Sequence, residues 1–317
     1  MPHHSRVLVV LYLLIPLGCS AGASPAASPS PTVSTASASP PGSSAQPLTA
    51  APTITPAPSV NAAWAPVPEQ AAVRAVQFQD VVWSGTRFVA VATTNEGSGA
   101  FLGSVDGMTW HRVDVAGATG YPMRLAVGAH GILAVGYYGE GRVTSWHSDD
   151  GLTWSAASAT FAKASTDSTI KVTDVVGTDT GWLAVGREDP ACQTACGHDP
   201  IRALVWTSDD GLAWTWVKDQ QALHGGAMTS VTRSSAGFVA VGAAGVNAAA
   251  WTSADGTTWI RAPDRAVLHS ALSAEGDAVT AMSWVAVGDG VIVAVGTESR
   301  SVATSPRRPA PGGRPTA

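Results

Sequence analysis

Positive charge is scarce in this chain of 317 residues, and lysine is nearly absent. Charged residues make up 13% of the sequence, the net charge is −5, and lysine occurs only at Lys163, Lys171 and Lys218. A protein that grips nucleic-acid phosphates needs a basic surface. The composition therefore excludes nucleic acid as an expected partner.

Cysteine is also rare, with three residues in the chain. Cys19 follows an apolar run near the N-terminus, which leaves Cys192 and Cys196 as a pair. In an oxidising compartment such a pair is expected to form a disulfide. A metal site that includes His198 is the alternative, but no second cluster of ligands lies at a suitable spacing. We therefore expect neither a metal nor a cofactor.

The apolar run at residues 7–17 is too short to cross a bilayer, because a spanning helix needs about 20 residues. Arg6 precedes the run and Gly18 follows it, which is the order of parts in an export signal. We predict a signal peptide at residues 1–19. Its end, IPLGC, resembles a bacterial lipobox, although Pro16 and Leu17 depart from the usual residues. The resemblance implies an extracytoplasmic protein held to the cell membrane by lipid on Cys19; an ordinary secretory signal is the alternative.

Two further segments lack the apolar residues that a core needs. Residues 20–60 contain no charged residue and consist almost wholly of Ala, Ser, Pro and Thr. Such a segment buries too little apolar surface to offset its chain entropy, so we predict a disordered linker. The proline-rich residues 306–317 form a second disordered segment. The folded domain is therefore expected at residues 61–305.

Valine-rich runs recur along this domain. They are FVAVA (88–92), ILAVG (132–136), WLAVG (182–186), FVAVG (238–242) and VIVAVG (291–296). A turn and another strand precede each run, and a third strand such as VTSWHS follows most of them. A fourth strand then begins at a tryptophan, so the unit is four antiparallel strands in about 45 residues. This repeat predicts an all-β chain, a β-propeller of four-stranded antiparallel blades.

The fifth repeat is incomplete. Residues 297–305 align with the third strands of the other repeats, and no fourth strand follows. The segment AAWAPVP at 62–68 resembles a fourth strand and is expected to close the ring, which gives five blades. A truncated ring of six or seven blades is the alternative.

A seven-residue turn occurs four times, as SVDGMTW (104–110), SDDGLTW (148–154), SDDGLAW (208–214) and SADGTTW (253–259). Its aspartate is expected to accept backbone N–H groups of its own turn, and its tryptophan to cover the seam between blades. Aspartates in four equivalent turns lie too far apart to share a substrate, so we predict a structural role. The residues concerned are Ser104, Asp106, Trp110, Ser148, Asp150, Trp154, Ser208, Asp210, Trp214, Ser253, Asp255 and Trp259.

The turn resembles the Asp-box, or BNR repeat, of sialidases and many other propellers. The usual form has one residue between Asp and Gly, whereas the two are adjacent in all four copies here. The resemblance covers the folded region and implies a sialidase-like propeller architecture. It implies no particular activity, because function depends on the site rather than on the fold.

Connections between the second and third strands lie on one face of a propeller, and they hold most of the candidate ligand-binding residues. These are Glu96, Tyr137, Tyr138, Glu140, Arg142, Arg187, His198, Arg202 and Arg300. In a chain with few charges, this concentration favours a non-catalytic site for a glycan or a surface protein. Simple solvation of exposed loops is the alternative.

A sialidase-like glycoside hydrolase is the second functional hypothesis. The family resemblance implies a tyrosine nucleophile with a glutamate and three arginines, for which Tyr138, Glu140, Arg142, Arg187 and Arg300 are candidates. However, the R-I-P motif of that family is absent from this chain. Photosystem II assembly-factor propellers have similar repeats, but nothing in the sequence selects that role.

Overall fold

The computed structural model describes residues 8–12, 66–113, 115, 120–138, 142–157, 160–161, 168–189, 201–269 and 278–300. Nearly all of them belong to one compact unit, Met1–Pro16 with Pro68–Ala317, and only Pro66 and Val67 belong to a second, Leu17–Val67. Within these ranges the chain forms strands and three short 3-10 helices but no α-helix, and so no helix that is long and apolar enough to cross a membrane.

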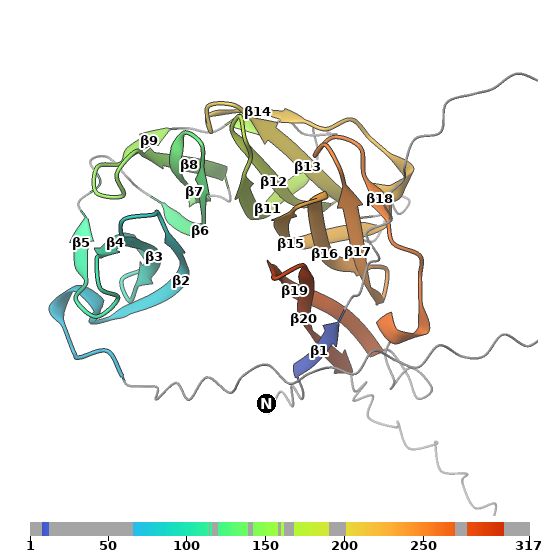
Figure 1. The fold of residues 1–317 in the computed structure, drawn as a ribbon, viewed down its shortest axis with the longest axis horizontal. Coiled ribbons are helices and arrows are strands. Elements are labelled where there is room, and N and C mark those ends of the chain that lie inside the picture. Colours follow the sequence, from blue (N-terminus) through green and yellow to red (C-terminus); the bar gives the residue numbers. More distant parts are fainter. Residues whose placement is uncertain are drawn as a thin grey trace, which may run out of the picture. The chain divides into compact units, whose positions relative to one another are not determined.

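Four sheets follow one another along the chain, and each contains four antiparallel strands in sequence order (Figure 1). The first sheet contains β2 (Val76–Trp83), β3 (Phe88–Thr94), β4 (Gly99–Ser104) and β5 (His111–Val113). The second contains β6 (Tyr121–Gly128), β7 (Gly131–Tyr138), β8 (Arg142–Ser148) and β9 (Ser155–Ala157). The third contains β11 (Thr169–Gly177), β12 (Trp182–Asp189), β13 (Arg202–Ser208) and β14 (Ala213–Trp216), with β10 (Thr160–Phe161) parallel to β14. The fourth contains β15 (Gly226–Ser234), β16 (Gly237–Ala244), β17 (Asn247–Ser253) and β18 (Ile260–Arg261). The predicted all-β propeller architecture of four-stranded sheets is confirmed.

The fifth sheet contains different strands from those that the sequence predicted. It contains β19 (Ala278–Gly288), β20 (Val291–Arg300) and β1 (Leu8–Tyr12), which pairs with β20 from Leu8 opposite Thr297 to Tyr12 opposite Val293. Residues 297–300 were expected in a third strand, but they continue β20. The reason is that β19 is long enough to pair with β20 as far as Arg300.

The expected closing strand is only partly described. Its residues 66–68 have no regular secondary structure. Two of the three are prolines, which lack the N–H group that a sheet ladder uses. Residues 61–65 lie outside the described ranges, so closure by the N-terminal segment and a count of five blades stay predictions.

The apolar core lies in the seams between successive sheets. Val89, Val91 and Phe101 of the first sheet pack with Leu125 and Trp146 of the second. Three further clusters fill the next three seams in the same way. Second strands such as β7 and β12 lie inside their sheets and place alternate side chains in two seams, and this explains the continuous valine-rich runs.

Each first strand carries one β-bulge at the same position in its sheet. The register shifts lie between Phe78 and Asp80, Pro122 and Arg124, Val172 and Asp174, Met228 and Ser230, and Met282 and Trp284. The residue after the bulge can bond to the next sheet. Asp80 accepts a hydrogen bond from the Leu125 N–H at 2.8 Å, and Asp174 accepts one from the Val231 N–H at 2.9 Å. The bulges therefore place polar side chains where successive sheets are joined.

The four repeated turns share one hydrogen-bond pattern. In the second sheet, the Oδ1 atom of Asp150 accepts the Leu152 and Thr153 N–H groups at 2.7 and 2.8 Å and the Ser148 hydroxyl at 3.2 Å. The Ser148 hydroxyl oxygen in turn accepts the Gly151 N–H at 2.8 Å. Gly151 has φ +74°, which favours glycine. These bonds hold the pKa of Asp150 below its ordinary value.

The tryptophan of each turn bonds back to the same turn. The indole N–H groups of Trp110, Trp154, Trp214 and Trp259 donate to the carbonyl of the turn glycine at 3.0–3.3 Å. Trp154, Trp214 and Trp259 are at most 5% exposed. The turn thus positions a large apolar side chain at a seam.

Replacement of Asp150 by alanine is expected to destabilise the domain without affecting ligand binding. Two turn N–H groups lose their acceptor, although water replaces it in part, so the expected loss is about 1 kcal/mol. The measurement is a urea unfolding curve beside a binding assay with the same preparation. Lost binding at an unchanged midpoint would contradict a purely structural turn.

Candidate functional site

Most of the described candidate residues lie at the ends of strands and not in loops, which corrects the sequence-based expectation. Tyr137 and Tyr138 end β7, and Arg142 begins β8. Arg187 lies in β12, and Arg202 begins β13. The connections between second and third strands are therefore shorter than expected, and the rigid ladder holds these side chains in place.

A cluster of charged and aromatic side chains forms beside the bulge of β6. We name it the Arg124 cluster, and its members are Arg124, Tyr137, Lys171, Arg187, Asp189 and Trp284. The Arg124 guanidinium lies over the Trp284 ring, 4.6 Å from its centroid. The Tyr137 hydroxyl bonds to the Val172 carbonyl, next to Lys171, and the charges of Arg124 and Arg187 lower its pKa while that of Asp189 raises it.

Asp189 neutralises part of the positive charge in this cluster. Its carboxylate lies 2.9 Å from Arg187 Nε and 3.3 Å from Lys171 Nζ. Lys171 and Arg187 are directly opposite each other in the β11–β12 ladder. One carboxylate therefore serves two cations, and Arg124 adds a third positive charge.

Arg124 has no carboxylate partner among the described residues. One of its terminal N–H groups donates to the Met123 carbonyl at 2.8 Å, and its Nε is buried without a hydrogen-bond partner. Asp80 and Asp174 are near enough for Arg124 to lower their pKa values. Both oxygens of each carboxylate accept backbone N–H groups instead. The Arg124 guanidinium thus keeps unused donors.

Burial controls the protonation of the two carboxyl groups beside Arg124. It raises the pKa of Asp80, and it raises the pKa of Asp174 to about 6, because the charged forms lose hydration. Hydrogen bonds from the backbone and the Ser230 hydroxyl oppose the shift at Asp174 without cancelling it. Near pH 6 the charge around Arg124 therefore changes with pH.

The Tyr137 side chain has a structural role in joining two sheets. Its hydroxyl donates to the Val172 carbonyl of the third sheet at 2.9 Å. Burial raises the pKa of its phenol above the ordinary value. A nucleophilic tyrosine needs the opposite shift, because the phenolate is the reactive form. Tyr137 therefore joins two sheets and is unsuited to attack a sugar.

Tyr138 and Arg142 form a separate pair at the exposed end of the β7–β8 hairpin. They are directly opposite each other in the ladder, and the guanidinium lies 5.3 Å from the ring centroid. Tyr138 is 40% exposed. The pair offers an aromatic surface with a positive charge beside it.

The other candidates do not join these groups. Glu96 is exposed in the β3–β4 turn, and Arg202 lies 3.7 Å from Asp219, which also contacts His224 at 2.9 Å. Cys19, Glu140, Cys192, Cys196, His198 and the side chain of Arg300 lie outside the described residues. In the described part of the chain, no group of three His, Cys, Asp or Glu side chains is arranged to hold a metal ion.

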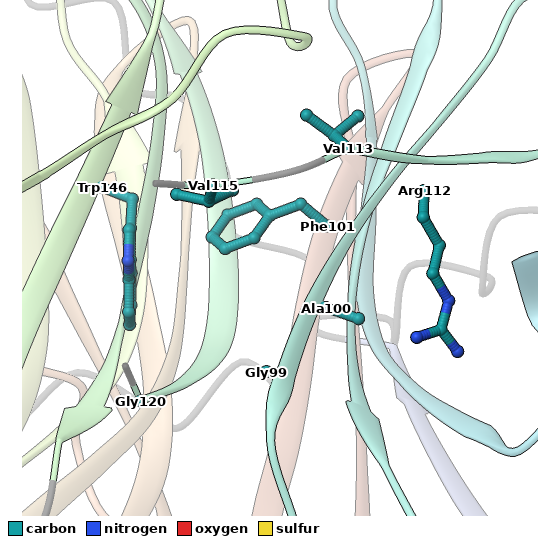
Figure 2. Close-up of a pocket in the computed structure, with 8 residues that line it drawn as sticks. All are labelled: Gly99, Ala100, Phe101, Arg112, Val113, Val115, Gly120 and Trp146. Atoms are coloured by element: carbon teal, nitrogen blue, oxygen red, sulfur yellow. The ribbon is translucent and has the colours of Figure 1, made fainter. Parts of the chain in front are cut away.

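A small cavity of about 170 Å³ lies between the first two sheets (Figure 2). Phe101 points toward Trp146 and Val115, whereas Arg112 extends to the other side of its strand (Figure 2). The Trp146 indole N–H is buried without a partner, although the equivalent Trp251 N–H donates to the Ala222 carbonyl at 2.8 Å. Ligand pockets usually measure about 300–1,000 Å³, so this cavity is too small for the main site.

Sequence reasoning missed Arg124 and Trp284. The signal was present, because the first strands align as DVVW, RLAV, DVVG, SVTR and WVAV. The first residue of each is the one after the bulge, and its type varies among Asp, Arg, Ser and Trp. A variable polar position within an otherwise apolar repeat indicates a residue that faces something other than the seam.

No protein-family model and no curated protein matches this sequence. Among solved structures, the chain is similar to a xylan β-1,4-xylosidase from Bacillus halodurans C-125, with 11% identity, a TM-score of 0.38 and coverage of 71% of this chain and 50% of the xylosidase. It thus spans about half of that protein's length. It is also similar to a mutant Aleuria aurantia lectin in complex with α-methyl-L-fucoside, with 12% identity, a TM-score of 0.40 and coverage of 70% and 71% of the two chains. Xylan and the fucoside are named for those two proteins, and the similarity assigns neither sugar to this chain.

Proposed function

We propose that this protein is a tethered extracytoplasmic β-propeller that binds an anionic glycan at the Arg124 cluster without turnover. The observation that carries the proposal is the Arg124 guanidinium, whose unused donors have no carboxylate partner within the described residues. A guanidinium presents a planar fork of donors that matches carboxylate and sulfate groups. The Asp189, Asp80 and Asp174 carboxylates near the cluster are held by other cations or by backbone N–H groups, so the unused Arg124 donors favour a negative ligand.

Aromatic side chains supply the second half of the recognition. Trp284 is 43% exposed beneath Arg124, and Tyr121 is 39% exposed on the same strand as Arg124. Sugar rings present C–H faces that pack on aromatic rings, while their charged substituents bond to nearby cations. The exposed Tyr138–Arg142 pair repeats this combination on the neighbouring hairpin.

Binding fits the described groups better than hydrolysis. A sialidase-like mechanism requires an activated tyrosine, whereas the Tyr137 phenol is hydrogen-bonded to a backbone carbonyl and has a raised pKa. Tyr138 has Arg142 against its ring. Neither tyrosine has a carboxylate base at hydrogen-bond distance among the described residues, as general-base activation would need.

A glycan array with the full-length chain tests the proposal. We expect binding to sulfated or uronic-acid-containing oligosaccharides, and we expect Arg124→Gln to weaken it at least tenfold by removing a charge-assisted fork of about 1.5–3 kcal/mol. Arg265→Gln, at an exposed arginine after the fourth sheet, is the matched control. Equal binding by both variants, binding of a surface protein alone, or release of sugar by the wild type would overturn the proposal.

Lipid attachment at Cys19 is part of the same proposal, supported by the IPLGC sequence and the charge-free linker that follows it. The cleavage before Cys19 that this attachment requires would remove β1 from the fifth sheet of the mature chain. A chain labelled with a palmitate analogue in bacterial cells should carry the label and fractionate with membranes. Cys19→Ala should carry no label and appear in the soluble exported fraction. Equal labelling of the two chains would remove the anchor and leave a secreted protein.

A further inference from the structure

We propose a second binding site, for a neutral saccharide, in the groove between the third and fourth sheets. This groove lies at the strand 1–2 and strand 3–4 turns of the two sheets, and the sequence predicted a structural role for the strand 3–4 turns. Its volume is about 670 Å³. That volume is within the roughly 300–1,000 Å³ of ligand pockets and well above the cavity between the first two sheets.

Four turns build the walls of the groove. The third sheet contributes the β11–β12 turn at 178–180 and the start of the β13–β14 turn at 208–209. The fourth sheet contributes the β15–β16 turn at 234–237 and the residues near Asp255. Trp182, Leu183 and Phe238 also line the groove and are at most 8% exposed, so they form an apolar base.

An exposed ion pair connects the two walls across the seam. The Arg233 guanidinium donates to both carboxylate oxygens of Asp179, at 2.7 and 2.5 Å. Arg233 is the one cation among the described lining residues, and both of its terminal nitrogens are engaged. The groove therefore has no free positive charge for an anionic ligand.

Several polar groups in the groove have no partner among the described residues. The hydroxyls of Thr180, Thr207 and Ser235 and the carboxylate of Asp209 all line it, and none makes a hydrogen bond within the described chain. The Asp255 carboxylate, by contrast, accepts the Thr257 and Thr258 N–H groups of its own turn. Free hydroxyls both donate and accept, and a free carboxylate accepts.

This pattern matches a ligand with many hydroxyl groups, since each sugar hydroxyl also donates and accepts. Asp209 and Asp255 add negative charge beside the paired Asp179, so the groove repels carboxylate and sulfate groups. No metal-binding group of three is present among the described residues. The apolar base suits the C–H face of a sugar ring. The ligand class thus differs from that of the Arg124 cluster.

The test is saturation-transfer NMR of the full-length chain with a panel of neutral hexose, deoxyhexose and N-acetylhexosamine oligosaccharides. We expect signal from at least one member and at least a tenfold weaker affinity in Thr207→Val with Ser235→Ala. Valine keeps the branched shape of Thr207, so the β13 strand should remain intact. Thr86→Val, an exposed hydroxyl in the equivalent turn of the first sheet, should bind as the wild type does.

Arg124→Gln separates the two sites. We expect it to leave neutral-saccharide binding unchanged even where it abolishes anionic binding, so each site can fail without the other. Loss of the neutral signal in Arg124→Gln but not in the groove variant would overturn the groove site. Absence of signal from the whole panel with a folded wild type would also overturn it.

Discussion

Replacement of Trp251 by alanine lowers the free energy of unfolding by an expected 3–5 kcal/mol, about the cost of truncating a fully buried aromatic side chain. Trp251 is 0% exposed and packs at the seam of the third and fourth sheets. Its indole N–H also donates to the Ala222 carbonyl at 2.8 Å. The loss therefore combines a cavity, reduced apolar burial and a carbonyl without its donor.

The seam position explains why the effect should reach the whole domain. Leu183 and Val185 of the third sheet share a cluster with Met228 and Trp251 of the fourth. A cavity there weakens the contact between two sheets and not only the stability of one. Urea denaturation followed by tryptophan fluorescence measures the change, with circular dichroism as a second probe because the substitution removes a fluorophore.

Trp83→Ala is the matched control. Trp83 is 49% exposed at the end of β2, where it contacts Phe88 at 4.8 Å between ring centroids. We expect it to cost about 1 kcal/mol, since half of its surface is already in water. Equal losses at Trp83 and Trp251 would contradict a core located in the seams.

Wild-type stability relative to an Asp174→Asn variant is expected to fall by about 2 kcal/mol between pH 4 and pH 7, since each pKa unit corresponds to about 1.36 kcal/mol and pH 4 already lies just above the unfolded pKa. Burial raises the pKa of Asp174 from 3.8 to about 6. The folded state thus binds this proton more tightly than the unfolded chain does. Its contribution is fully present below the unfolded pKa and is lost as the pH rises through the folded pKa.

The measurement is the unfolding free energy of both chains at pH 4, 5, 6 and 7. Subtraction of the variant removes the parallel contribution of Asp80, whose pKa burial also raises. Asparagine cannot titrate, so its own curve carries no such slope from position 174. A constant difference across this range would show that the Asp174 carboxylate is stabilised as a charge by its hydrogen bonds.

The turn aspartates act in the opposite direction. Backbone N–H groups hold the pKa values of Asp106, Asp150, Asp210 and Asp255 below the ordinary value. Their contribution is present above the unfolded pKa near 4 and is lost as the pH falls further. The Asp174 effect is therefore confined to the range above pH 4, where the turns are already fully charged.

Local chemistry explains which features could be predicted from the sequence. A few consecutive apolar residues are enough to predict a strand. The turn from Ser148 to Trp154 contains both the donors and the acceptors of its own hydrogen bonds. These strand and turn patterns recur in each unit of about 45 residues, so the four-stranded unit and the propeller architecture could be predicted from the sequence. The fifth sheet departed from prediction where pairing between β19 and β20 continued past the expected turn.

The sites depended on contacts between residues far apart in the chain. The sequence predicted Tyr137 as a ligand-binding residue, but in the structure its hydroxyl donates to the Val172 carbonyl, 35 residues later in the chain. Arg124 keeps unused donors because Asp80 bonds to Leu125 and Asp174 to Val231, which leaves the guanidinium without a carboxylate partner among the described residues. The sequence by itself determined the repeating scaffold, because strands and turns are satisfied within a few residues. Only the tertiary structure decided which polar groups remain free to bind, because their partners come from other sheets.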